Sequence, residues 1–262
     1  MKAILRWPGS KWRIADWIVR QFPTHETYVE PFFGSGAVFF HKNPSGTETI
    51  NDIDNEVVNL FRIVRDHAEK LCKAIEMTPY SRQEYISSMD TKDADPLERA
   101  RRFLVRTWQG YGSKTSCTTS WAHDRTNTVF RPKYWSLLPE RILDIVERLK
   151  MVQIENMDAL ELIALYNRKS TLLYVDPPYL LETRTSKHYK HEFTTRQKHL
   201  ALLEVCMKHK GPCLISSYDN ELYNTVLRDW KKRTIKVQTN NAKTAIECLY
   251  LNRMADMEMR LF

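Results

Sequence analysis

Asp176, Pro177, Pro178 and Tyr179 follow the apolar run 172–175, and together they carry the most evident chemistry in this chain. Proline fixes its own φ and holds the preceding residue extended, so the turn is stiff. The Asp176 carboxylate and the Pro177 carbonyl can accept both hydrogens of one NH₂ group, and the Tyr179 ring can stack on a flat heterocycle. The stretch predicts a site for an exocyclic amine on a base, although strand–Pro–Pro turns also occur as plain loop punctuation.

A second candidate site lies near the start of the chain. An apolar strand beginning near Thr27 ends at Glu30 and Pro31, and Gly34 and Gly36 then open a helix. Glycine lets a ligand approach the backbone closely, and a helix N-terminus offers N–H groups that lack partners within the helix. The chain has 7 glycines, and two of them stand at this one turn, which favours a cofactor-binding loop.

The next strand, over 49–50, ends close to Asp52. In doubly wound sheets an acid about 20 residues after the glycine loop hydrogen-bonds a ribose, and Asp52 lies near that distance. Asp54 or Asn55 is expected to cap the helix that follows. The two strand endings predict a cofactor that contains a nucleoside, held at the carboxyl edge of a parallel sheet.

Strands and helices alternate again after residue 150. Asp158 follows the first of these strands, where it either caps the next helix or meets the base of the cofactor. The expected strands are 152–154, 172–175, 213–217, 234–237 and 246–251, and the expected helices are 160–165, 200–207 and 222–230. The fold class is therefore expected to be α/β, with a mostly parallel Rossmann-like sheet and a terminal antiparallel strand.

Between about 67 and 149 this alternation stops, and helices are expected over 71–77, 82–89 and 97–109. The segment 99–135 contains many basic residues but only one acid, Asp124, and aromatic residues are interleaved among them. This mixture suits phosphate contact and base-edge reading, and a solvated insertion with some core aromatics is the alternative. The residues expected to contact DNA are Arg102, Arg106, Tyr111, Lys114, Arg125, Arg131 and Lys133.

Composition narrows the class of protein further. The 262 residues are 42% hydrophobic and carry a net charge of +8, which favours a polyanionic partner. No apolar run approaches the roughly 20 residues of a membrane span, and the start does not resemble a signal peptide. The 5 cysteines lack metal-ligand spacing, so we expect reduced thiols, no metal and a cytoplasmic protein (bacterial, phage or nucleoid-associated) without an obligate protein partner.

In their order along nearly the whole chain, these motifs resemble the Dam-type (D12 class, alpha-group) DNA adenine N6-methyltransferases, which depend on S-adenosylmethionine. The matching segments are 6–11 (RWPGSK), 30–36 (EPFFGSG), 52–54 (DID) and 176–179 (DPPY). The resemblance implies that Asp176, Pro177 and Tyr179 are catalytic. It implies cofactor contacts from Trp7, Lys11, Glu30, Pro31, Phe32, Gly34, Gly36, Asp52, Ile53, Asp158 and Asp176.

The resemblance also implies a division of the chain. Residues 1–66 and 150–262 would form the catalytic domain, and residues 67–149 the DNA target-recognition insertion. The tip at 114–119 departs from the arginine-bearing hairpin of GATC-specific members, so their recognition sequence does not carry over. The expected activity is methyl transfer from S-adenosylmethionine to N6 of a flipped-out adenine in a specific double-stranded DNA sequence. An RNA adenine methyltransferase and a non-catalytic DNA-binding regulator are the alternatives.

Overall fold

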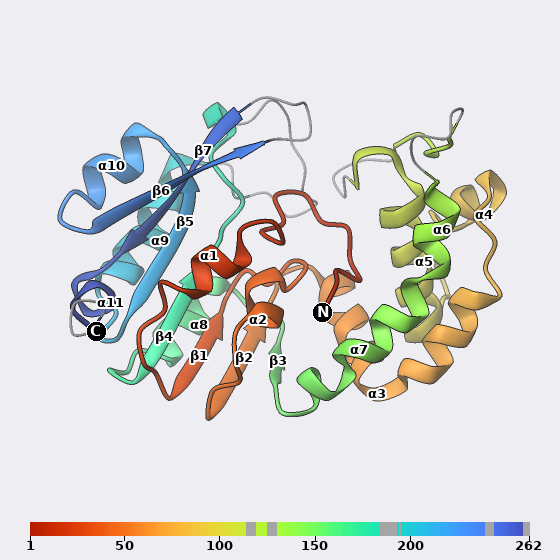
Figure 1. The fold of residues 1–262 in the computed structure, drawn as a ribbon, viewed down its shortest axis with the longest axis horizontal. Helices are drawn as coiled ribbons and strands as arrows, with labels where there is room; N and C mark the ends of the chain where they lie inside the picture. Colours follow the sequence, from red (N-terminus) through yellow and green to blue (C-terminus); the bar gives the residue numbers. More distant parts are fainter. Residues whose placement is uncertain (114–118, 125–129, 184–192, 194, 239–243, 259–262) are drawn as a thin grey trace.

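A seven-stranded sheet forms the centre of the computed structural model, which describes residues 1–113, 119–124, 130–183, 193, 195–238 and 244–258 (Figure 1). The strand order is β3-β2-β1-β4-β5-β7-β6, and β7 runs antiparallel to both of its neighbours. The predicted mostly parallel sheet with a terminal antiparallel strand is therefore confirmed. The strands are β1 (Thr27–Glu30), β2 (Thr47–Asn51), β3 (Gln153–Glu155), β4 (Thr171–Val175), β5 (Cys213–Tyr218), β6 (Lys231–Gln238) and β7 (Thr244–Leu251).

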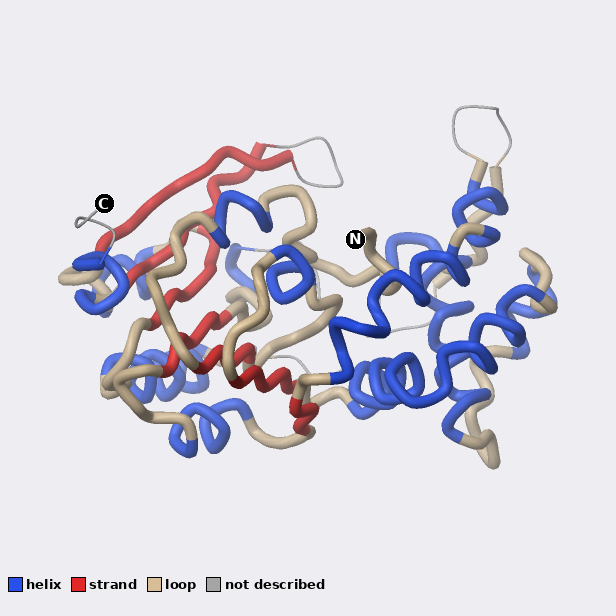
Figure 2. Tube along the Cα trace, turned by 60° about the horizontal axis from the view of Figure 1, so that its bottom comes forward, coloured by secondary structure: helices blue, strands red, loops and turns tan. Residues whose placement is uncertain are grey.

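The central strands bury both of their faces, and successive residues enter different cores because side chains alternate along a strand. Tyr28 and Tyr174 join a core with α1 (Ala15–Val19) and α2 (Ala37–His41). Their neighbours Val29 and Val175 join a second core with three other helices, so helices lie on both sides of the strands (Figure 2). Those helices are α8 (Ala159–Leu165), α9 (Arg196–Met207) and α10 (Glu221–Val226).

The chain reverses its direction across the sheet between β1 and β4. It passes from β1 outward to β2 and β3, and it then returns to place β4 on the other side of β1. Ligands of open α/β sheets bind outside the carboxyl ends of the strands at such a switch point. The residues that follow β1, β2 and β4 therefore lie where ligands bind in sheets of this kind.

Helices α3 to α7 form a second lobe beside the edge of the sheet that carries β3 (Figure 1). Within it α3 packs along both α5 and α7, and its hydrophobic core continues into that of one sheet face. The helices are α3 (Asn55–Glu76), α4 (Arg82–Ser87), α5 (Pro96–Gln109), α6 (Arg131–Ser136) and α7 (Leu138–Lys150). We call residues 67–149 the insertion, which is the range that the sequence predicts.

The separate helix expected over 71–77 is the end of a longer helix. Helix α3 runs through 22 residues and contains one non-helical position, His67, with φ −141° and ψ 36°. Leu71 and Ile75 continue the buried face that Leu60 and Val64 begin, so packing carries the helix across the kink. The boundary expected at residue 67 consequently falls inside a helix, while the division into two domains stays a prediction.

Several other elements differ from expectation. Helices α6 and α7 and the terminal α11 (Arg253–Glu258) were not expected, and α10 ends four residues before the predicted end at residue 230. Short 3-10 turns lie at Tyr111–Ser113 and Leu181–Thr183. Of the helices that the structure describes, none has both the length and the apolar character of a membrane span.

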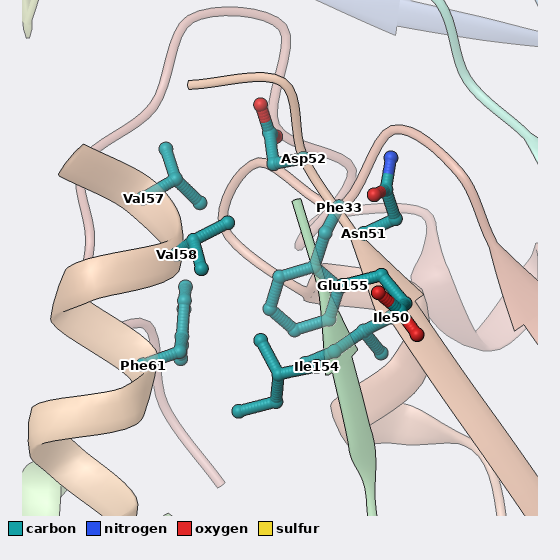
Figure 3. A pocket seen from close by; sticks show the side chains of 9 residues that line it. All are labelled: Phe33, Ile50, Asn51, Asp52, Val57, Val58, Phe61, Ile154 and Glu155. Atoms are coloured by element: carbon teal, nitrogen blue, oxygen red, sulfur yellow. The ribbon is translucent and has the colours of Figure 1, made fainter. Parts of the chain in front are cut away.

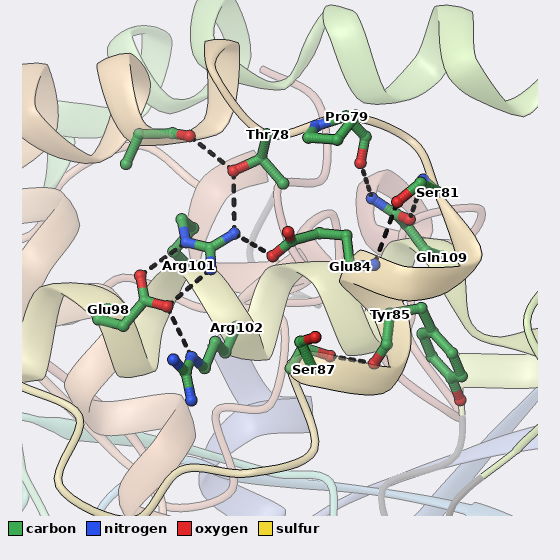
Figure 4. Close-up of polar contacts among 12 residues, drawn as sticks. Thr78, Pro79, Ser81, Glu84, Tyr85, Ser87, Glu98, Arg101, Arg102 and Gln109 are labelled. Atoms are coloured by element: carbon green, nitrogen blue, oxygen red, sulfur yellow. Dashed lines mark hydrogen bonds and ion pairs between the residues drawn. The ribbon is translucent and has the colours of Figure 1, made fainter.

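An ion-pair network holds the start of the insertion together (Figure 4). The Arg101 guanidinium on α5 contacts Glu84 on α4 at 2.5 Å and Glu98 on α5 at 2.6 Å. It also donates a hydrogen bond of 2.9 Å to Thr78, which follows α3. Three helices thus meet at one side chain, whose donors are arranged as a fork that suits carboxylates.

Candidate active site at the carboxyl edge of the sheet

Lys11 is the central charged residue of this edge. Its ammonium nitrogen lies 2.9 Å from Asp176 Oδ2, and it donates a 2.9 Å hydrogen bond to the Gly9 carbonyl. The same nitrogen is 3.8 Å from Glu247 Oε1 and 4.7 Å from the centroid of the Tyr179 ring. The segment before α1 and the turn after β4, far apart in sequence, therefore meet as the resemblance implies.

The Tyr179 side chain lies inside the protein, with 7% of its surface exposed. Its hydroxyl donates a hydrogen bond to Glu247, and its ring meets the edge of the Tyr218 ring at a centroid distance of 4.7 Å. The sequence predicts a ring displayed beyond the strand end, but a buried acid and a neighbouring cation hold it inward. Stacking of Tyr179 on a base stays a prediction.

Burial sets the protonation of the carboxyl groups here. It raises the pKa of Glu247 to about 7 and that of Glu30 to about 8. The pKa of Asp176 is also raised by burial, and the Lys11 ammonium opposes that rise. Tyr28 donates a 2.7 Å hydrogen bond to Glu30, which partly offsets the effect of burial on the Glu30 pKa. Glu247 and Glu30 therefore change charge near neutral pH, and the Asp176 carboxyl binds a proton more readily than an exposed one.

The loop after β1 requires both of its glycines. Gly34 has φ +50°, and a Cβ at that position would lie 2.6 Å from Trp7 Nε1. Gly36 has φ +67°, and its Cβ would lie 2.4 Å from the Phe33 ring. Side chains rarely adopt such positive φ values, and the space is already filled. The loop can therefore lie directly against Trp7. The centroid of the Trp7 ring is 6.3 Å from that of Phe103 in the insertion.

Asp52 follows β2 with its carboxylate fixed by two backbone groups. The Gly34 N–H donates to Oδ2 at 2.8 Å, and the Asp54 N–H donates to Oδ1 at 2.9 Å. Burial raises the Asp52 pKa to about 6, and these two hydrogen bonds oppose the rise. The glycine loop and the predicted ribose acid are thus in direct contact.

Beside Asp52 lies a small, mostly apolar hollow, which we call the Asp52 hollow (Figure 3). It is lined by Phe33, Ile50, Asn51, Asp52, Val57, Val58, Phe61, Ile154 and Glu155. Ile53, next in sequence to Asp52, keeps 45% of its surface exposed. Apolar walls next to an oriented carboxylate suit a nucleoside, whose base is flat and whose ribose carries hydroxyl groups.

Two side chains near the strand ends have local roles that were expected in part. Asp54 caps α3 by accepting from the Glu56 N–H at 3.0 Å. Asp158 caps α8 by accepting from the Leu160 N–H at 2.8 Å, and it is exposed to solvent. The structure thus confirms capping by Asp54 and one of the two alternatives for Asp158, whose contact with a cofactor base stays a prediction.

Two residues that sequence reasoning missed organise this edge. Asn51 is buried, donates to the Pro31 carbonyl at 2.9 Å, and accepts from the Met157 N–H at 2.9 Å, so it ties the ends of three strands. Glu247 reaches the site from β7. An asparagine at a strand end is a weak sign of such a role. The residues around Glu247 in the sequence give no sign that it reaches the site. Phe32, which was expected near the cofactor, is half-buried and packs on Phe193 at 5.8 Å.

The residues expected to contact DNA fall into three groups. Arg102 pairs with Glu98, Arg131 pairs with Asp124, and Arg106 donates to the Ser88 carbonyl and pairs with Glu56. Tyr111 and Lys133 are exposed, with 67% of the Tyr111 surface accessible. Lys114 and Arg125 lie outside the described residues. DNA contact by all seven stays a prediction, and three of them already have protein partners.

The buried charge at this edge suits a cationic ligand. Glu30, Asp52, Asp176 and Glu247 are acids whose pKa burial raises, and Lys11 is the basic residue that lies between two of them. A positively charged ligand would favour the ionised form of each acid and reduce the cost of burying it. The residues at the edge therefore fit a cofactor that joins a nucleoside to a cationic group, as S-adenosylmethionine does.

The chain is similar in sequence to DNA methyltransferases of known name. The DNA adenine methylase of Salmonella typhi is 26% identical over 253 residues, covering 90% of this chain and 88% of that protein. The type II methyltransferase M1.LlaDCHI of Lactococcus lactis subsp. cremoris is 25% identical over 266 residues, covering 94% of this chain and 91% of that protein. A SAM dependent methyltransferase structure from Agrobacterium tumefaciens matches with a TM-score of 0.41 and 10% identity, covering 92% of this chain and 59% of that chain.

A family model matches most of the chain. Its description is D12 class N6 adenine-specific DNA methyltransferase, and it covers residues 7–246. The match includes Lys11, the glycine loop, Asp52, the Asp176 turn and the start of β7 as far as residue 246. The chain therefore belongs to the D12 class N6 adenine-specific DNA methyltransferase family.

Proposed function

We propose that this protein transfers the methyl group of S-adenosylmethionine to N6 of an adenine flipped out of a specific double-stranded DNA sequence. The observation that carries the proposal is the position of Asp176. Its carboxylate stands on a stiff Pro–Pro turn at the switch point between β1 and β4, paired with Lys11 at 2.9 Å. The glycine loop and Asp52 lie at the ends of the strands on the other side of the switch point.

The turn after β4 is the part that activates the amine. Adenine N6 is a poor nucleophile because its lone pair is delocalised into the ring. Asp176 and the Pro177 carbonyl would accept its two hydrogens and draw the nitrogen towards tetrahedral geometry. The lone pair would then point away from the plane of the base. Much of the rate enhancement comes from this positioning and from fixed dipoles.

Lys11 favours the ionised form of Asp176, which this role requires. Burial raises the Asp176 pKa, and the Lys11 ammonium counters that rise. An ionised carboxylate accepts hydrogen bonds from an amine more strongly than a neutral acid does. Because the ion pair uses Oδ2, it also fixes the direction in which the carboxylate points.

The cofactor site would be formed by the strand ends beside the Asp176 turn. S-adenosylmethionine supplies an electrophilic methyl group on a sulfonium. Asp52 would accept hydrogen bonds from the ribose hydroxyls, and the Asp52 hollow and Ile53 would receive the adenine ring. Glu30 and the loop of Gly34 and Gly36 would shape the space for the amino-acid end, with Trp7 lying against that loop.

The insertion would supply recognition of DNA. A base inside a duplex is out of reach of the Asp176 turn, so the target adenine must leave the stack. Tyr179 would stack on it, an interaction worth about 1–3 kcal/mol per base. Residues 67–149 would bind the duplex through Tyr111, Lys133 and the basic residues predicted near them.

Transfer of a labelled methyl group from S-adenosylmethionine to DNA tests the proposal. We expect label in duplex DNA from a host without adenine methylation, recovered as N6-methyl-2′-deoxyadenosine after digestion. Sequencing of modified bases gives the target sequence. Structured RNA serves as the competing acceptor. If label appeared in RNA alone, the substrate would be RNA and not DNA. Asp176→Ala should transfer label at least about 100-fold more slowly. If Asp176→Ala transferred label as fast as the wild type, the role of the Asp176 turn would be wrong.

A further inference from the structure

Glu247 reaches the site from β7, the strand that runs against the rest of the sheet. In the sheet register it pairs with Tyr218 on β5 and with Ile235 on β6. Its side chain is buried, with 4% of the residue exposed. The residues after it on the same strand, Cys248 and Leu249, are apolar and fully buried. An apolar residue would therefore suit packing at position 247, so packing does not explain why an acid stands there.

The contacts of Glu247 point to the proposed reaction. Its Oε1 accepts the Tyr179 hydroxyl hydrogen and lies 3.8 Å from the Lys11 ammonium. The groups that act on its pKa, burial aside, are Lys11, Asp176 and Tyr179. Placing a carboxylate in a dry environment costs several kcal/mol unless partners compensate. Here the two partners that lower the Glu247 pKa, Lys11 and Tyr179, both belong to the proposed transfer site.

Lys11 stands between two carboxylates that compete for it. Its ammonium has three donor hydrogens, and Gly9 O and Asp176 Oδ2 each lie at 2.9 Å. Glu247 Oε1 at 3.8 Å is beyond hydrogen-bond distance but within range of strong Coulomb attraction in a dry site. The pull of Glu247 therefore limits how firmly Lys11 binds Asp176.

Building on the proposed transfer reaction, we propose that Glu247 is a positioning residue for it. It holds the Tyr179 ring by its hydroxyl and draws part of the Lys11 charge away from Asp176, which leaves the oriented Asp176 carboxylate a stronger acceptor for the target amine. Without Glu247, Lys11 would give its whole charge to Asp176 and compete with the incoming amine. The Tyr179 ring would also lose the acceptor that fixes its plane.

Three substitutions at position 247 separate the two contacts. Glu247→Ala removes both the hydrogen-bond acceptor and the charge. Glu247→Gln keeps an acceptor oxygen for Tyr179 at almost the same size and removes the charge. Glu247→Asp keeps the charge on a shorter arm. Glu221→Gln, an exposed carboxylate at the start of α10, is the matched control.

The measurement is the single-turnover rate of methyl transfer on a duplex that carries the mapped target, with the dissociation constant for the same duplex measured separately. Glu247→Ala should lower the rate by about 10- to 100-fold, the loss expected for a buried hydrogen bond to a charged group. The dissociation constant should change by less than about threefold. Glu247→Gln should recover part of the rate, and Glu221→Gln should match the wild type.

The pH profile gives an independent readout. The titratable and charged groups facing Glu247 are Lys11 from the N-terminal segment, Asp176 and Tyr179 from the turn after β4, Tyr174 on β4 and Tyr218 on β5. Wild-type transfer should accelerate as pH rises through about 7, where Glu247 ionises. Glu247→Gln should lose this rise, and Glu221→Gln should keep it.

Two kinds of failure can be told apart. If the wild type transfers no label, the proposed function fails whatever position 247 does. If the wild type is active and Glu247→Ala matches Glu221→Gln in rate and pH profile, only the positioning role is overturned. It is equally overturned if the nearly isosteric Glu247→Gln weakens DNA binding, cofactor binding and the melting temperature together, because that outcome indicates a purely structural acid.

Discussion

Charges are treated in opposite ways at the sheet edge and in the insertion. In the insertion, Arg101 pairs with Glu84 and Glu98, and this pairing lowers the pKa of Glu98. At the sheet edge, Lys11 faces both Asp176 and Glu247, and burial raises the pKa of both acids. Within the insertion, the charges of Arg101, Glu84 and Glu98 are matched by folding alone. The edge keeps an excess of acid that a cationic ligand or a target amine would match.

The two regions are joined along the N-terminal segment. The Trp108 indole on α5 donates a 2.7 Å hydrogen bond to the Ile4 carbonyl, and the Arg6 guanidinium lies 4.7 Å from the Trp108 ring centroid. A further ion cluster joins Arg148 of α7 to Glu48 of β2, which Lys42 also contacts. The contrast in charge therefore exists within one continuous structure.

The largest effect in this contrast between the sheet edge and the insertion is expected for Asp176→Asn. We expect the rate of methyl transfer to fall by about 10²- to 10³-fold, because a neutral amide replaces a charged acceptor of amine hydrogens. The melting temperature should stay within about 3 °C of the wild type, since the substitution removes a carboxylate that burial disfavours. Thermal melts and single-turnover rates check both, with the exposed Asp229→Asn as control. A large fall in melting temperature would make Asp176 a structural residue instead.

The second test is the pH dependence of stability without cofactor. Glu247, Glu30 and Asp52 have folded-state pKa values of about 7, about 8 and about 6, above their ordinary values of 4.5, 4.5 and 3.8. The native state then binds more protons than the unfolded state across this range, so the free energy of unfolding falls as pH rises from about 5 to 8. For Glu247 alone, a rise from 4.5 to about 7 corresponds to about 3 kcal/mol.

Urea midpoints measured from pH 5 to 8 show this slope. Glu247→Gln should flatten it, because the amide does not titrate. Glu98→Gln should leave it unchanged in this range, since the Glu98 pKa is lowered and its protonation occurs at more acidic pH. A rise of stability with pH in the wild type would contradict the raised pKa values at the edge.

The smallest expected effect concerns the insertion. Arg101→Met leaves Glu84 and Glu98 without their shared cation, and we expect a loss of about 1–2 kcal/mol in the free energy of unfolding. Arg65→Met breaks the exposed pair with Asp66 and should cost less than about 1 kcal/mol. Denaturant titrations of both variants give the comparison. Equal losses would show that the Arg101 network adds nothing beyond a surface ion pair.

Features governed by neighbouring residues could be read from the sequence. Asp54 caps the helix that follows it, as expected for a side chain that accepts an N–H group of a first turn. The strands of the sheet were found because their apolar runs and endings are local. Asp52 and Asp176 could be predicted as site candidates for the same reason, since each follows directly on a strand, and Gly34 lies in the loop after β1.

Features governed by distant packing could not be read in this way. Glu247 lies 68 residues from Tyr179, and their contact depends on β7 entering the sheet next to β5. Arg106 was expected to bind DNA, yet its pairing with Glu56 joins positions 50 residues apart. The Tyr179 ring was expected outside the protein because its partners, Lys11 and Glu247, come from opposite ends of the chain. The spacing of residues within one segment carries no information on such partners.

The length of α3 has a consequence for the exchange of recognition parts between relatives. Its first turns line the Asp52 hollow through Val57 and Phe61, and its last turns pack inside the insertion through Leu71 and Ile75. A graft joined at residue 67 would divide one helix and separate two halves of a continuous apolar face. A transplantable unit must therefore start at or before the beginning of α3 at Asn55. Such a unit brings one wall of the Asp52 hollow with it, so target specificity and that wall would be inherited together.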